Sequence, residues 1–188
     1  MKLLGPKTNE TRPITDRAKE SLFSVLFKYD LIEGGSVADL FSGTGSMGLE
    51  CLSRGAKYAT FIEQNRKVAD ILKKNIEKAQ FTSQSRVLSA NVFSTGAPVT
   101  ADVEKYDLVF VDPPYKMSAN CKEGTKVAKL MTMLSGQVTN GGIVVLRTHK
   151  RSEYLEEYGN LKLIDQRKWG TMCVALFQRD PEGRSDDL

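Results

Sequence analysis

The chain has 188 residues, 40% of them hydrophobic and 27% charged, and its formal net charge is +4. This length suits one α/β domain with its own core, and the mild positive charge permits a nucleic-acid partner without requiring one. No apolar run approaches the length of a membrane span, and one histidine with three scattered cysteines gives no zinc or disulfide pattern. We therefore expect a cytoplasmic monomer with no membrane contact and no metal.

Hydrophobic periodicity and chain breakers predict alternating strands and helices. Residues 1–14 are expected to be irregular, residues 15–180 to form the domain, and residues 181–188 to be a frayed tail. Strands are expected at about 36–41, 58–63, 86–89, 108–111, 142–148, 161–164 and 172–178. Helices are expected at about 15–29, 46–54, 65–79 and 124–135, with a short one near 152–157.

This order of elements predicts an α/β fold. Strands that alternate with helices form a parallel sheet covered by helices on both faces. Only Asp165 to Thr171 separate the last two strands, which is too short for a crossover helix, so these strands should pair antiparallel. We expect a single Rossmann-like domain whose seven-stranded sheet is mostly parallel and has an antiparallel terminal strand.

A glycine-rich turn follows the first predicted strand. Gly43, Gly45 and Gly48 fit the G-x-G-x-x-G spacing between a strand and a helix. That spacing allows NAD(P), FAD or S-adenosylmethionine, and also a turn with no ligand. Asp39 favours S-adenosylmethionine, because its carboxylate can face a methionine ammonium but would lie unfavourably close to a pyrophosphate. Glu63, twenty residues after Gly43, is placed to accept from ribose hydroxyls.

A second motif, Asp112-Pro113-Pro114-Tyr115, directly follows an apolar run that predicts a buried strand. Two prolines end the strand sharply, since neither can donate a ladder hydrogen bond. In open α/β sheets the carboxyl ends of strands bind ligands. The carboxylate, the Pro113 carbonyl and the aromatic ring can together hold a planar group that carries an amine. The alternative is an ordinary Asp-Pro turn.

With both motifs placed, the chain resembles class I S-adenosylmethionine-dependent methyltransferases. More narrowly, it resembles the bacterial RsmD-type family that methylates N2 of a guanine in small-subunit (16S) ribosomal RNA. The seven-stranded sheet with a terminal hairpin is the layout of such a Rossmann-like methyltransferase domain. Four segments carry the resemblance: residues 11–23, which match R-P-T-T-D-x-x-[RK]-E-[ST]-[IL]-F with Ile14 in place of the first Thr, then residues 39–56, 111–115 and 168–170.

The front of the chain departs from the family pattern. Family members usually begin with a basic, glycine-rich strand pair, of which only Lys2-Leu3-Leu4 is left as a remnant here. In the family that arm is suited to grip RNA phosphates. Its absence leaves open whether another basic surface of this chain compensates.

The resemblance implies S-adenosylmethionine as cofactor and ribosomal RNA or the small ribosomal subunit as partner. It places the cofactor against Asp39, Phe41, Gly43, Gly45, Glu63 and Asn91. It places the target amine against Asp112 and the Pro113 carbonyl, with Pro114 in the same loop and Tyr115 stacked on the base. For Asn91, whose side chain would reach the adenine, a simple turn-forming role is the alternative.

Basic and aromatic residues supply the expected RNA contacts. Asp16 is expected to cap the first helix, while Arg12, Arg17 or Lys19 meets RNA phosphate; the alternative is a solvated helix face. Trp169 either stacks on nucleic acid or covers the sheet edge. The basic cluster at residues 147–151 either touches RNA or is a solvated turn before the short helix near 152–157.

Three other functions stay open at this stage. The same chemistry could act on adenine N6 of DNA or RNA, or on a protein amide, since each presents an amine beside a planar π system. An NAD-dependent dehydrogenase would need a substrate domain for which 188 residues leave no room. A non-enzymatic RNA-binding module would leave the glycine loop without a purpose.

Overall fold

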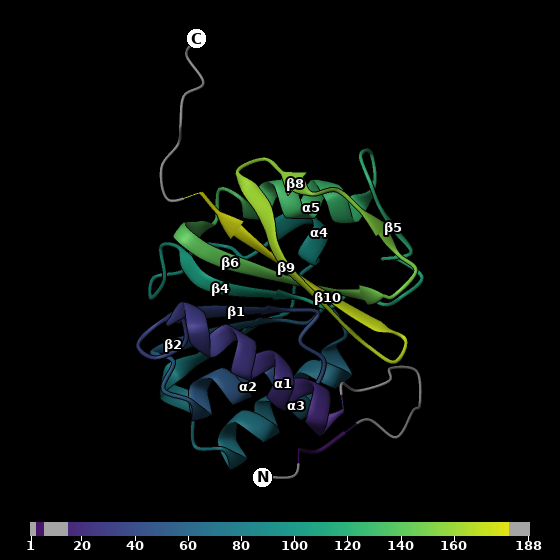
Figure 1. Ribbon diagram of the computed structural model, residues 1–188. Coiled ribbons are helices and arrows are strands. Elements are labelled where there is room, and N and C mark those ends of the chain that lie inside the picture. Colours follow the sequence, from purple (N-terminus) through teal and green to yellow (C-terminus); the bar gives the residue numbers. More distant parts are fainter. Residues whose placement is uncertain (1–2, 6–14, 181–188) are drawn as a thin grey trace.

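The computed structural model describes residues 3–5 and 15–180, and its centre is one large sheet (Figure 1). The sheet contains β1 (Ser36–Leu40), β2 (Tyr58–Ile62), β3 (Ser85–Leu88), β4 (Tyr106–Val111), β6 (Val138–His149), β8 (Glu157–Tyr158), β9 (Leu161–Trp169) and β10 (Met172–Arg179). A small separate pair consists of β5 (Asn120–Cys121) and β7 (Glu153–Tyr154). The helices are α1 (Asp16–Leu26), α2 (Ser46–Ser53), α3 (Arg66–Lys78), α4 (Val92–Thr95) and α5 (Lys126–Leu134), with 3-10 turns η1 (Phe27–Tyr29) and η2 (Thr82–Gln84).

The strand order confirms the α/β prediction. It runs β3-β2-β1-β4-β6-β10-β9-β8. Neighbouring strands from β3 to β6 are parallel, whereas β10 is antiparallel to both β6 and β9. All seven predicted strands are in this sheet, and β8 adds two residues at its edge. The order reverses direction between β1 and β4, so the loops that follow these two strands leave the sheet side by side at a topological switch point.

Helices cover both faces of the sheet, as predicted. Strand residues point alternately to the two faces, and they divide into two hydrophobic clusters. Val37, Phe61 and Phe110 pack with α1, α2 and α3, while Leu40 and Val111 pack with α4 and α5. Figure 1 shows α1, α2 and α3 below the sheet and α4 and α5 above it.

Side chains cap the main helices where the sequence predicts them to begin. The Thr15 hydroxyl accepts from the Ala18 N–H at 3.3 Å, so the expectation that Asp16 caps α1 is wrong; Asp16 is its first residue. Asn65 caps α3 in the same way, and Thr125 caps α5. Helix α1 ends at Leu26 and continues as η1, which reaches the predicted end near residue 29.

The short helix expected near 152–157 is wrong. Long-range hydrogen bonds hold this stretch extended: the Glu153 N–H donates to the Ala119 carbonyl at 3.3 Å, and β7 pairs with β5. The buried Tyr158 hydroxyl donates to the Cys121 carbonyl at 2.7 Å. Partners that lie more than thirty residues away in sequence therefore decide the conformation here.

Residues 3–5 are irregular, as expected, and Leu4 is held by the buried Asn75 side chain through bonds of 2.8 and 3.1 Å. The expectations for the rest of 1–14 and for 181–188 lie outside the described residues. Within the described part of the chain, no helix has both the length and the apolar character needed to cross a bilayer.

Candidate active site at the carboxyl edge of the sheet

The two sequence motifs meet at one edge of the sheet. In the register, Leu40 lies beside Val111 on one side and Ile62 on the other, and Val111 lies beside Leu146. Neighbouring strands are about 4.8 Å apart. The residues that follow these strand ends are therefore adjacent across the edge: Glu63, Phe41, Asp112 and Arg147. This adjacency is what the sequence motifs require if cofactor and target amine are to meet.

The glycine loop is a strained turn held by its own hydrogen bonds. Phe41, Gly43 and Gly45 have positive φ angles of 59°, 54° and 87°, and such a conformation is costly for a bulky residue such as Phe41. The Ser42 hydroxyl donates to the Asp39 and Ile62 carbonyls at 2.7 and 3.0 Å. These bonds fix the path of the backbone before any ligand arrives.

The three motif glycines have different roles. A Cβ at Gly45 would lie 2.4 Å from the Leu72 side chain, and one at Gly48 would lie 2.4 Å from the Phe61 ring. These two glycines therefore allow α2 to pack closely on α3 and β2. A Cβ at Gly43 would meet nothing closer than 4.0 Å. Gly43 is the glycine that leaves open space where a ligand can approach the backbone.

Glu63 holds this loop from the neighbouring strand. Its Oε2 accepts from the Gly43 N–H at 3.0 Å, and its Oε1 accepts from the Asn65 N–H at 2.8 Å. The side chain is half-buried, so it can still be approached from the edge. The predicted ribose contact stays a prediction, while the contact with Gly43 ties the two predicted cofactor residues together.

Asp39 lies beneath the loop and is almost fully buried, with 2% of its surface exposed. Its Oδ2 accepts from the Gly48 N–H at 2.9 Å, in the first turn of α2, where the helix dipole favours a negative charge. Burial nevertheless raises the pKa of Asp39 from 3.8 to about 7, the Gly48 bond opposes this, and the charges of Asp112 and Glu63 add to it. The predicted contact with a methionine ammonium stays a prediction.

These three carboxylates test which cofactor the edge can accept. Asp39, Glu63 and Asp112 are close enough for their charges to act on one another. A cation placed among them relieves this repulsion, and an anionic pyrophosphate increases it. The edge therefore fits a cofactor with a sulfonium and an ammonium group better than a dinucleotide. Within the described residues, no group of three or more His, Cys, Asp or Glu side chains is placed to hold a metal.

Asp112 is fixed in place by Arg147, which the sequence analysis did not select as a site residue. The Arg147 Nε donates to Asp112 Oδ1 at 2.6 Å, and 13% and 27% of the two side chains are exposed. Burial raises the pKa of Asp112, and Arg147 opposes that rise. Oδ2 has no partner among the described residues, so Asp112 keeps one oriented acceptor available.

The two prolines divide their carbonyl groups between structure and site. The Pro114 carbonyl accepts from the N–H groups of Met117 and Ser118 at 2.8 and 3.3 Å, which closes the turn. The buried Pro113 has a carbonyl that accepts from no described residue. It is therefore available as the second acceptor that the sequence motif requires. Tyr115 is 37% exposed, so part of its ring is free for stacking.

Asn91 caps the unpredicted helix α4. Its Oδ1 accepts from the Phe93 N–H at 3.0 Å, which is the turn-forming role that the sequence left open. The Phe93 ring meets the Phe41 ring edge-on at 5.5 Å. This contact joins the loop after β3 to the glycine loop, and an adenine contact by Asn91 stays a prediction.

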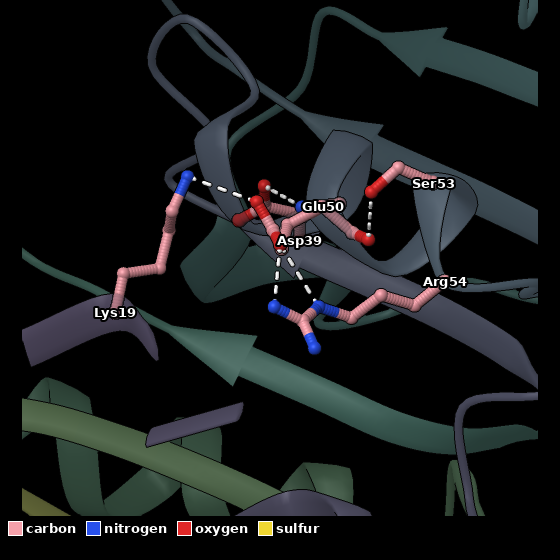
Figure 2. A network of polar contacts seen from close by, with 6 residues as sticks. Lys19, Asp39, Glu50, Ser53 and Arg54 are labelled. Carbon is pink, nitrogen blue, oxygen red and sulfur yellow. Dashed lines mark hydrogen bonds and ion pairs between the residues drawn. The ribbon is translucent and has the colours of Figure 1, made fainter. Parts of the chain in front are cut away.

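The predicted RNA residues have different surroundings. Lys19 pairs with Glu50 at 3.0 Å, and Arg54 also pairs with Glu50, at 2.8 Å, while lying over the Phe23 ring (Figure 2). Burial raises the pKa of Glu50, but the two cations outweigh it and lower the pKa below its usual value. This network attaches α1 to α2, so Lys19 has a structural partner. Its RNA contact stays a prediction.

The other predicted RNA residues are Arg17, Trp169 and Arg12. Arg17 is exposed on α1. Trp169 ends β9, pairs through Met172 with His149 at the site edge, and packs half-buried on the cluster beneath α1. This agrees with the edge-covering alternative and keeps Trp169 near the site. Arg12 lies outside the described residues.

Comparisons with known proteins agree with this geometry. The family described as Conserved hypothetical protein 95 matches residues 1–178. The "Ribosomal RNA small subunit methyltransferase D" of Escherichia coli (strain K12) is 29% identical over 191 residues, which cover 98% of this chain and 88% of that protein. The protein of the same name from Haemophilus influenzae is 38% identical over 104 residues, covering 55% and 53%. A solved structure of yhhF from Escherichia coli superposes with a TM-score of 0.76, at 27% identity, covering 96% of this chain and 92% of that one.

Proposed function

The chain belongs to the Conserved hypothetical protein 95 family, the RsmD family, and from this premise we propose that it methylates N2 of a guanine in small-subunit ribosomal RNA. S-adenosylmethionine-dependent methylation of ribosomal RNA is the activity that its relatives support. The guanine N2 acceptor is the finer part of the proposal. The observation that carries it is the adjacency of the glycine loop and the Asp112 motif at the β1/β4 switch point.

Bound at the glycine loop, S-adenosylmethionine supplies a methyl group on a positively charged sulfur, from which the methyl can be transferred to a nucleophile. Gly43 leaves room for its approach, and Glu63 and Asn91 are placed for its nucleoside. The carboxylates at the edge match its positive charge. The strained backbone at Phe41 and Gly43 is already held by Ser42 and Glu63, so little ordering is left for binding to do.

The amine clamp consists of Asp112 Oδ2 and the Pro113 carbonyl. A guanine N2 amine is a weak nucleophile, because its lone pair is delocalised into the ring. Two acceptors that bind its N–H groups hold the lone pair out of the ring and direct it toward the cofactor. The negative charge of Asp112 stabilises the positive charge that grows on nitrogen. The surplus proton then leaves to Asp112 or to water.

Arg147 and Tyr115 support this clamp in different ways. Arg147 holds Oδ1 and keeps the carboxylate ionised and oriented. Tyr115 offers a half-exposed ring on which the extruded base can stack, and stacking offsets the few kcal/mol needed to remove a base from its helix. Orientation and fixed charge, rather than a strong base, would therefore carry the catalysis.

Labelled S-adenosylmethionine and small ribosomal subunits lacking the modification test the proposal. The RNA is digested after incubation and its nucleosides are separated. The expected product is N2-methylguanosine. Label in N6-methyladenosine, or in protein, would contradict the acceptor while keeping the chemistry of the clamp. No transfer to subunits, naked RNA, DNA or protein would contradict the enzyme assignment itself.

A further inference from the structure

A second hollow lies beside the amine clamp, between the loop after β4 and the end of β6. It has a volume of about 300 Å³ and is lined by Tyr115, Lys116, Ala119, His149, Arg151 and Ser152. This volume is at the lower end of that of small-ligand pockets. Tyr115 belongs to both the clamp and this hollow, so a chain that places its base in the clamp also passes over the hollow.

The hollow carries positive charge that the protein does not neutralise. Lys116 and Arg151 are exposed, and neither makes an ion pair within the described part of the chain. The nearby Glu153 is already paired with Lys122 at 3.0 Å. A phosphate bound here would therefore meet two cations without displacing a carboxylate.

Aromatic rings form one wall of the same hollow. The rings of Tyr115 and His149 meet edge-on, with centroids 5.7 Å apart and planes at 78°. His149 Nδ1 accepts from the Arg151 N–H at 3.2 Å. In the neutral ring this leaves the proton on Nε2, which is a further donor for a phosphate oxygen. Cations beside aromatic faces are the combination that binds single-stranded nucleic acid.

We propose that this hollow binds the phosphate and base of the nucleotide that flanks the target in single-stranded RNA. The inference rests on the proposed function, since the clamp sets where the target base lies. An extruded nucleotide needs its neighbouring backbone held, and Lys116 and Arg151 are in position beside Tyr115. The basic cluster at residues 147–151 then has two tasks: Arg147 faces inward to Asp112, while His149 and Arg151 face the RNA.

Fluorescence anisotropy with a labelled single-stranded RNA of about 12 nucleotides tests this inference without using methyl transfer. The probe is titrated at several salt concentrations with the wild type and with the double variant Lys116→Ala/Arg151→Ala. We expect binding at low salt to weaken about tenfold or more, and the slope of log K against log salt to fall by about 1.4, or about 0.7 per lost phosphate contact. Both side chains are exposed, so the variant should fold normally.

The matched control is Lys73→Ala/Lys74→Ala on α3, which removes the same charge from exposed positions on another element. Equal losses in the two double variants, or no loss in either, would overturn the inference. Methyl transfer by the wild type together with unchanged RNA binding by Lys116→Ala/Arg151→Ala would refute the hollow and leave the proposed function intact. Pocket-dependent RNA binding with no transfer to any substrate would do the reverse.

Discussion

The glycine loop and the amine clamp lie side by side at one edge of the sheet, but they are built differently. In the loop, Asp39, Ser42 and Glu63 all bond to the protein's own backbone. In the clamp, one oxygen of Asp112 is held by Arg147, while the other oxygen and the Pro113 carbonyl have no described partner. The loop is complete without a ligand, whereas the clamp keeps its acceptors free.

This difference separates stability from chemistry. Substitutions in the loop should change the free energy of unfolding together with cofactor affinity, because the same bonds serve both. Substitutions in the clamp should change methyl transfer and leave folding nearly intact. Four variants test this division.

The largest expected effect is that of Asp112→Asn. The amide oxygen can keep the bond from Arg147, which turns the NH₂ group toward the target amine and removes the acceptor. We expect the rate of methyl transfer to fall at least about 100-fold, with the melting temperature and S-adenosylmethionine affinity nearly unchanged. Single-turnover assays and calorimetry measure both. Asp70→Asn, exposed on α3, is the control; an active Asp112→Asn enzyme would refute the clamp.

Asp39→Asn should stabilise the protein at high pH. The pKa of Asp39 is raised to about 7 in the folded state, so between its ordinary value and 7 the folded state holds a proton that the unfolded state has lost. Stability therefore falls as pH rises through this window. The variant lacks this loss, and we expect a gain on the order of a few kcal/mol at pH 8, with weaker cofactor binding. Denaturation at pH 5 and pH 8 measures the change; equal pH dependence in both proteins contradicts it.

Gly48→Ala should destabilise the loop by crowding. Its methyl group would lie 2.4 Å from the Phe61 ring, and overpacking of this kind costs about 1–3 kcal/mol. Urea denaturation measures the loss. Gly136→Ala is the matched control, since its nearest contact is an ordinary 3.6 Å. If both variants unfold at the same urea concentration, the close packing of α2 on β2 does not constrain this position.

The smallest effect should come from Arg147→Gln. Burial raises the pKa of Asp112 and Arg147 lowers it, so losing the arginine raises this pKa further. Since Asp112 acts in its ionised form, the acid limb of the pH–rate profile should move to higher pH, and activity near pH 7 should fall about tenfold. Arg147→Lys, which keeps the charge, should restore most of the activity. A pH profile identical to that of the wild type would show that Arg147 has no part in the clamp.

Local patterns were enough to predict most of this molecule. The alternation of elements, the antiparallel hairpin and the meeting of both motifs at one edge are confirmed by the sheet order. Helix α4 was missed because four residues are too few to show a helical period. The pairing of Arg147 with Asp112 was missed because it depends on which strands are neighbours, although a basic residue at the end of a strand beside β4 was a usable signal.

The switch point between β1 and β4 also divides the chain in sequence. The predicted cofactor residues all come from residues 39–91, and the clamp and hollow all come from residues 112–152. Recombination or drift confined to the second segment could exchange one methyl acceptor for another while the donor half stays untouched. A sheet with this strand order lets substrate range diversify without rebuilding the machinery that activates the methyl group.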